Sequence, residues 1–178
     1  MKKLIMVAAF AALACLMPSP VLLNESAAGD EGLAQFFFAV TSGDGNTSDR
    51  IGLLGAGTFG IGFVKGGGTF QRSTPSVTPP NTLVNWGTWK ATRFLSFTET
   101  PGSPFGQVIA GILTMEVELR PLGQPRVAAT MEVVCNLAAG ALFTGEDEGV
   151  TLTLNNGTTF GPIGQGATTF PAGHGEDN

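Results

Sequence analysis

Tyrosine is absent from this 178-residue sequence, histidine occurs once and cysteine twice. The only histidine, His174, lies close to the C-terminus, so a Ser-His-Asp or Cys-His site would have no base in the body of the chain. One histidine and two distant cysteines do not supply the usual ligands of a zinc site. A literal G-x-G-x-x-G at 55–60 lacks the helix and the acidic residue that a dinucleotide site needs after it. The sequence therefore predicts no catalytic residue, no metal site and no cofactor.

Charge is also scarce. Charged residues make up 13% of the chain, and the net charge is −5. An acidic surface offers no counter-charge to nucleic acid or to an anionic membrane, so we expect neither as a partner. No disulfide framework is expected, because Cys15 lies in the N-terminal segment and Cys135 has no partner. Cys135 falls on the apolar face of its strand, which is typical of a packed thiol.

The N-terminus has the pattern of a secretory signal peptide. Lys2 and Lys3 precede an apolar run at 4–17, and small residues at 26–28 predict cleavage before Gly29. The run is shorter than the roughly 20 residues of a transmembrane helix, so no membrane span is expected. We expect a secreted, periplasmic or cell-surface protein.

The domain organisation follows from this signal. We expect a signal peptide at 1–28, one all-β domain at 29–170 and a flexible C-terminal tail at 171–178. A lipid anchor at Cys15 is the alternative to simple cleavage, and the apolar residues at 16–17 disfavour it. Removal of 28 from 178 residues leaves 150, which is enough for one domain with a sizeable core.

The stretch 108–137 predicts one long antiparallel hairpin. Both arms alternate apolar and polar residues, and proline and glycine fill the turn at 121–125. A turn centred on Gly123 gives one register in which apolar residues face each other: Leu119 with Val127, Val117 with Ala129, Met115 with Met131, and Leu113 with Val133. A slip by one residue would bury the glutamates of both arms, so this register is well specified.

Small-Thr-aromatic triplets recur along the chain. They occur at 57–59, 68–70 and 87–89, with looser copies at 157–160 and 167–170. A glycine within a strand permits a bulge or a sharp coil, and a neighbouring ring can cover the exposed backbone. Repeated devices of this kind allow a sheet to curve and close on itself.

No helix is expected after the signal segment, and short strands with glycine-rich turns predict an all-β fold. The first choice is a single antiparallel β-barrel, and the second is a β-sandwich. The glycine-rich rhythm of 66–70, with the Gly-Thr-Trp strand at 87–89, resembles calycin-type barrels such as allene oxide cyclases and dirigent proteins. The resemblance implies a calycin-like, allene-oxide-cyclase-like barrel and no particular activity.

The hairpin carries a cluster of charge on one face. Glu116, Glu118 and Glu132 share that face with Arg120 and Arg126. A solvated face with cross-strand ion pairs is the favoured interpretation. If the face points into a barrel, the same cluster becomes a polar binding pocket. The carboxylate spacing suits glycoside hydrolysis, but any pair at i and i+2 on a strand has it.

A long strand at 86–98 supplies further candidates. Trp89, Ala91, Leu95 and Phe97 are expected on one face, which Arg93 interrupts. Arg93 is expected either at a barrel rim or paired inside with a carboxylate. The candidate ligand-binding residues are Glu116, Glu118, Glu132, Arg93, Trp89 and Phe97.

Three functions are compatible with these patterns. The favoured one is an exported, non-catalytic barrel whose mouth or interior binds a small apolar or amphipathic molecule. The second is a structural or surface-assembly protein that forms homo-oligomers and has no ligand. The third and weakest is a carboxylate-dependent enzyme that uses Glu116, Glu118 or Glu132.

Overall fold

The computed structural model describes residues 34–76, 81–101, 103, 107–136 and 144–172. The expected signal peptide, Cys15 and His174 lie outside these residues. Of the expected C-terminal tail, only Pro171 and Ala172 are described, and Ala172 forms a bridge to Ala34. The described part contains no helix with the length and apolarity needed to cross a membrane.

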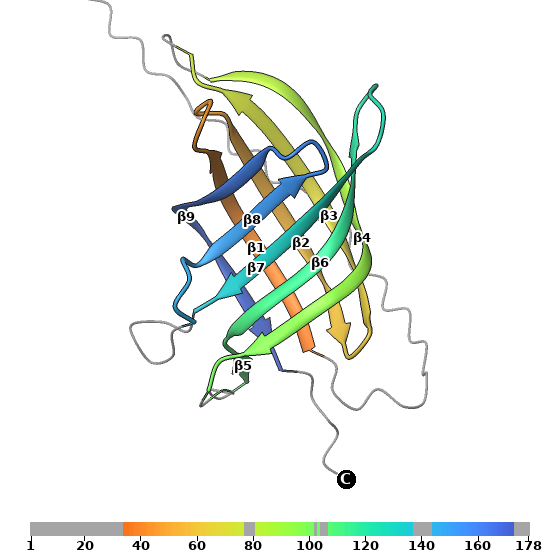
Figure 1. Ribbon diagram of the computed structural model, residues 1–178, viewed down its shortest axis with the longest axis vertical. Helices are drawn as coiled ribbons and strands as arrows, with labels where there is room; N and C mark the ends of the chain where they lie inside the picture. Colours follow the sequence, from red (N-terminus) through yellow and green to blue (C-terminus); the bar gives the residue numbers. More distant parts are fainter. Residues whose placement is uncertain (1–33, 77–80, 102, 104–106, 137–143, 173–178) are drawn as a thin grey trace, which may run out of the picture.

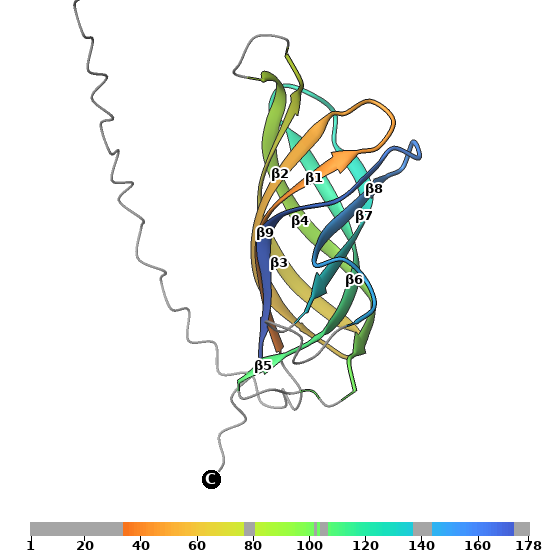
Figure 2. The same cartoon turned by 90° about the vertical axis from the view of Figure 1, so that its left-hand side faces the viewer.

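Nine strands join in one antiparallel sheet, which confirms the all-β class. They are β1 (Ala34–Asp44), β2 (Arg50–Gly60), β3 (Phe63–Thr74), β4 (Thr82–Glu99), β5 (Val108–Ile109), β6 (Gly111–Pro121), β7 (Val127–Cys135), β8 (Gly149–Leu154) and β9 (Thr159–Pro171). Their order in the sheet is β1-β2-β3-β4-β6-β7-β8-β9-β5, and β1 also pairs with β9. Hydrogen bonding therefore runs around a ring of tilted strands, with β5 beside the end of β9 (Figures 1 and 2).

The β6–β7 hairpin has the predicted register. Leu119 lies opposite Val127, Met115 opposite Met131, and the pairs between and beyond them follow the same alignment. Gly123 in the turn has a φ of 70°, a conformation that glycine adopts without a steric penalty. Apolar matching across the buried face was thus sufficient to fix the pairing.

The prediction for β4 was wrong at Leu95. The pairing of β4 with β6 shifts between Ala91 and Arg93 and again between Phe94 and Ser96. Each shift reverses the alternation of the strand, so Phe94 turns inward while Leu95 is 39% exposed. Two shifts cancel, which returns Phe97 to the inner face. Because Arg93 lies between the shifts, it faces outward and does not interrupt the apolar face.

Two strands are longer than the sequence pattern indicated. β4, expected over 86–98, already begins at Thr82 and ends at Glu99. The triplet copy at 167–170 lies in a much longer strand, β9, which starts at Thr159 and closes the ring by pairing with β1. Glycine and proline concealed the extension of β9, because neither residue fits the usual composition of a strand and the segment 159–166 contains both.

Aromatic rings fill the interior beside β2. Phe36, Phe38 and Trp89 stack on one another, with centroids 6.0 Å apart for the two phenylalanines and 5.5 Å for Phe38 and Trp89. They occupy the space in front of inward-facing glycines. A Cβ on Gly55 would lie 2.2 Å from Trp89 Cζ2, and one on Gly57 would lie 2.6 Å from Phe36. Glycine is required here because the rings take the volume of its missing side chain.

Cys135 is buried at the end of β7, as predicted for a packed thiol. Its Sγ lies 3.6 Å from the carbonyl oxygen of Thr168. Burial raises the pKa of the Cys135 thiol, so the reactive thiolate is disfavoured.

Replacement of Gly55 by alanine should destabilise the protein by about 1–3 kcal/mol, because the methyl group must displace Trp89 or Phe38 from a filled interior. The measurement is the guanidinium chloride midpoint, followed by circular dichroism. Gly161→Ala is the matched control in β9, since its Cβ would meet no atom within 4 Å. Equal midpoints for the two variants would contradict the packing described.

Candidate functional site

The two ends of the ring of strands differ in chemistry. At the upper end in Figure 1, Arg72 of β3 reaches Asp49, which follows the β1–β2 turn. Arg72 Nε and Nη2 donate to Asp49 Oδ2 at 3.1 and 2.6 Å. The same guanidinium lies 5.6 Å from the ring centroid of Phe160. A paired charge that rests on an aromatic face therefore lies at this end.

Further hydrogen bonds complete the upper end. Asp44 accepts from the backbone N–H of Asn46 at 2.8 Å and from Thr47 Oγ1 at 2.7 Å. These bonds, above all that from Thr47, lower the pKa of the Asp44 carboxyl. Ser42 is fully buried and donates through Oγ to the carbonyl oxygen of Val150 at 2.5 Å. Polar groups at this end are therefore held by one another and present little apolar surface.

The lower end in Figure 1 is apolar and hollow. We call this cavity the lower mouth; its volume is about 560 Å³. Residues from the ends of several strands line it: Ala34, Phe59, Gly60, Ile61, Phe94, Ser96, Phe97, Glu99, Ile109 and Ala172. This volume lies within the usual range of small-molecule sites, roughly 300–1,000 Å³.

Three phenylalanines meet where the lower mouth joins the core. The ring centroid of Phe97 lies 4.8 Å from that of Phe59 and 5.6 Å from that of Phe170, and the last two are 5.7 Å apart. Phe170 and Phe59 are almost fully buried, whereas Phe97 is partly exposed towards the cavity. The cluster gives the lower mouth a rigid aromatic floor.

The rim of the lower mouth carries the polar groups. Ser96 and Glu99 come from the end of β4, and Ile61 in the β2–β3 turn is fully exposed. The first shift in β4, between Ala91 and Arg93, turns Phe94 inward towards this cavity. The core side of the lower mouth is apolar and its solvent side is polar. A molecule with an apolar body and a polar end could make contacts with both.

Of the six candidate residues, Phe97 alone lines the lower mouth. Trp89 instead lies in the filled interior with 2% of its surface exposed, and its indole N–H donates to the carbonyl oxygen of Leu54 at 3.0 Å. Sequence reasoning missed Phe94, Ile109 and Ile61 as site residues. The sequence feature that could have pointed to this cavity is the triplet at 57–59, because its phenylalanine, Phe59, lines it.

The other four candidates lie on the outer face of β4, β6 and β7. Arg93 Nε donates to Glu116 Oε2 at 2.9 Å, and a second bond joins Arg93 Nη2 to Glu116 Oε1. Glu132 lies on the same outer face, opposite Thr114 in the sheet register. This arrangement is the solvated ion-pair face that the sequence favoured. It does not form a pocket with Trp89 or Phe97.

Glu118 is held by two arginines on this face. Arg120 Nε donates to Glu118 Oε1 at 2.7 Å, and Arg126 Nη1 approaches the same oxygen at 3.2 Å. Hydrogen bonds from arginine, Arg93 for Glu116 and Arg120 for Glu118, are the main reason why the pKa of each carboxyl is lowered. A glycosidase acid requires the opposite shift, so neither carboxyl is adapted to donate a proton at neutral pH.

Comparisons with protein-family models, with curated proteins and with solved structures find no match for this chain. Within the ranges that the structure describes, no group of three or more histidine, cysteine, aspartate or glutamate side chains could hold a metal ion.

Stability should fall as the pH is lowered from 7 to 3. The carboxyls of Asp44, Glu116 and Glu118 have lowered pKa values in the folded state, so their contribution is complete above the unfolded values of about 4. It is lost as the pH falls through the folded values, where the carboxyls gain protons. The measurement is the urea midpoint at each pH.

The Asp44→Asn variant should show a smaller difference between pH 7 and pH 3 than the unchanged protein, because one of these carboxyls is gone. Asp147→Asn, in an exposed loop, serves as the control. An unchanged pH difference in the Asp44 variant would show that its hydrogen bonds contribute nothing.

Proposed function

We propose that this protein is an exported, non-catalytic β-barrel that binds a small apolar or amphipathic molecule at the lower mouth. The observation that carries the proposal is the aromatic floor of this cavity: Phe59 and Phe97 line an open volume of about 560 Å³, and Phe170 packs against both rings on the core side. Apolar surface that remains open at the end of a filled core is favourable to cover.

The pairing of β1 with β9 supports a barrel, because it brings the first and last long strands together. The inner face of the ring consists of large apolar side chains such as Met115, Met131 and Leu152, all fully buried. An eight-stranded ring has an interior just wide enough for such side chains. A ligand is therefore expected at an end of the ring, and not along its axis.

The contrast between the two ends favours the lower mouth as the binding end. Arg72 and Asp49 occupy the upper end with paired charge, whereas Phe94, Phe97 and Ile109 present hydrocarbon at the lower one. An apolar ligand gains nothing by displacing an ion pair, but it gains about 25 cal/mol for each Å² of apolar surface that it covers. The rim glutamate, Glu99, gives a polar end of the ligand a partner.

Export is supported by the N-terminal sequence, in which Lys2 and Lys3 precede an apolar run and small residues. A non-catalytic role is supported by the arginine-paired state of Glu116 and Glu118. Carboxylates paired in this way neutralise the arginines on a solvent-exposed face.

Uptake of the fluorescent apolar probe N-phenyl-1-naphthylamine by the purified protein tests the proposal. The Phe94→Ala variant should bind the probe about fivefold more weakly, the effect of about 1 kcal/mol of lost apolar contact. Ile61→Ser at the rim should also weaken binding. The measurement is a fluorescence titration, with thermal unfolding to show that each variant remains folded.

Leu122→Ser is the matched control, since Leu122 is an exposed aliphatic residue in the β6–β7 turn at the opposite end of the ring. Probe binding that is equal in the Leu122 and Phe94 variants would place the bound probe elsewhere. Absence of probe uptake in the unchanged protein would remove the proposal.

A further inference from the structure

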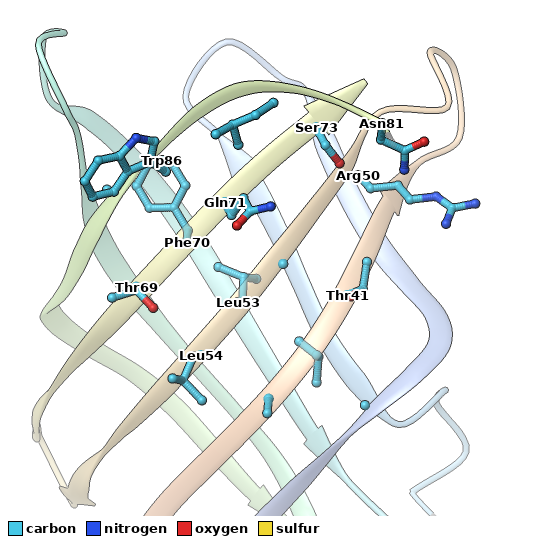
Figure 3. A pocket seen from close by; sticks show the side chains of 16 residues that line it. Thr41, Arg50, Leu53, Leu54, Thr69, Phe70, Gln71, Ser73, Asn81 and Trp86 are labelled. Carbon is cyan, nitrogen blue, oxygen red and sulfur yellow. The ribbon is translucent and has the colours of Figure 1, made fainter. Parts of the chain in front are cut away.

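A second hollow lies on the outside of the ring, over β1–β4, and differs in chemistry from the lower mouth. We call it the outer groove; its volume is about 870 Å³ (Figure 3). Outward-facing residues of four neighbouring strands line it, among them Thr41, Arg50, Gly52, Gln71, Ser73 and Trp86, and the exposed Leu54 and Leu83 line it too. Polar and apolar groups are therefore mixed here, whereas the lower mouth is mainly aliphatic and phenyl.

The sheet register places these residues in a row across the strands. Trp86 lies opposite Gln71, Gln71 opposite Gly52, and Gly52 opposite Thr41. Neighbouring strands are about 4.8 Å apart, so the row is about 14 Å long. Arg50 lies in the adjacent row, opposite Ser73. Figure 3 shows these side chains along one open surface.

Gly52 makes the floor of the outer groove. It carries no side chain between Gln71 and Thr41, so the row has a gap at its centre. Its backbone does not require glycine: a Cβ built there would meet only the carbonyl oxygen of Gln71, at an ordinary contact distance of 3.8 Å. The hollow thus exists because a side chain that would fit is missing.

Trp86 is 53% exposed, although tryptophan is costly to leave in water. Trp89, three residues on, is buried in the core, so the two indoles point to opposite faces of β4. An exposed indole offers a flat π-face to C–H groups, and an amide and hydroxyls beside it can donate to and accept from hydroxyl groups. This combination fits a sugar ring, which has an apolar face and a hydroxyl edge.

Other ligand classes fit the outer groove less well. Strands β1–β4 are each paired on both sides, so no free strand edge is available to an extended peptide. Arg50 is the only cation among the residues that line the groove, and the chain is acidic, which disfavours nucleic acid. An acyl chain would leave Gln71 and Thr41 without partners in the middle of the contact.

We propose that the outer groove binds a short oligosaccharide that carries a carboxylate. One sugar ring stacks on Trp86, hydroxyl groups exchange hydrogen bonds with Gln71 and Thr41, and the carboxylate pairs with Arg50. The site is separate from the lower mouth and does not depend on the function proposed there.

The test screens the full-length protein on an array of immobilised neutral and uronic-acid-containing oligosaccharides, and measures the strongest hit by titration calorimetry. Trp86→Ala should weaken this binding at least about tenfold. Gly52→Val should abolish it, because the new side chain fills the floor while suiting a strand. Arg50→Gln should weaken binding of acidic sugars and leave that of neutral ones unchanged.

Thr151→Val is the control, since it adds the same valine to the outer face of β8 and should leave binding unchanged. Circular dichroism melting shows that each variant folds. An array without hits, or a hit that Trp86→Ala and Gly52→Val do not affect, overturns the proposal. Sedimentation that shows a dimer lost in the Trp86 variant, with no sugar bound, would assign the groove to a second copy of the chain and equally overturn it.

Discussion

The contact on which the ring of strands depends is the packing of aromatic rings against glycines. Phe36, Phe38 and Trp89 stack in the interior, and Gly55 and Gly57 leave them the room to do so. Larger residues on β2 would force either the rings or the strands apart. Because the interior is filled in this way, open space remains only where the packing ends, at the lower mouth and on the outside.

The outside of the ring is divided into two unlike surfaces. Over β4, β6 and β7, arginines pair with Glu116 and Glu118, and such exposed pairs add little to stability. Over β1–β4 the outward positions hold Trp86, Gln71 and other side chains that can contact a ligand. One strand, β4, belongs to both surfaces, and its first register shift, between Ala91 and Arg93, lies between Trp86 on one surface and Arg93 on the other.

Much of the fold could be predicted from the sequence, since alternation determines which residues face each other. The β6–β7 register followed from apolar matching across the buried face. The shifts in β4 could not be predicted, because nothing in the residue types at 91–96 distinguishes a strand with two shifts from one that alternates regularly. For the same reason the lining of the lower mouth was only partly anticipated. Phe97 was a candidate and lines the cavity, whereas Phe94 of the same strand faces it only because of an unpredicted shift, and Phe59 and Ile109 come from strands that the closed ring brings near.

The pairing of β1 with β9 also bears on how the chain acquires its structure. The pairings between the other long strands join elements that are adjacent or nearly adjacent in sequence, whereas β1, once paired with β2, finds its second partner only in β9, the last strand of the ring. Until then the outer edge of β1 offers unsatisfied N–H and C=O groups to any other chain. Contacts between such distant segments close slowly, since most of the chain must first be ordered. A newly made molecule is therefore most prone to aggregate in the interval before its final strand docks.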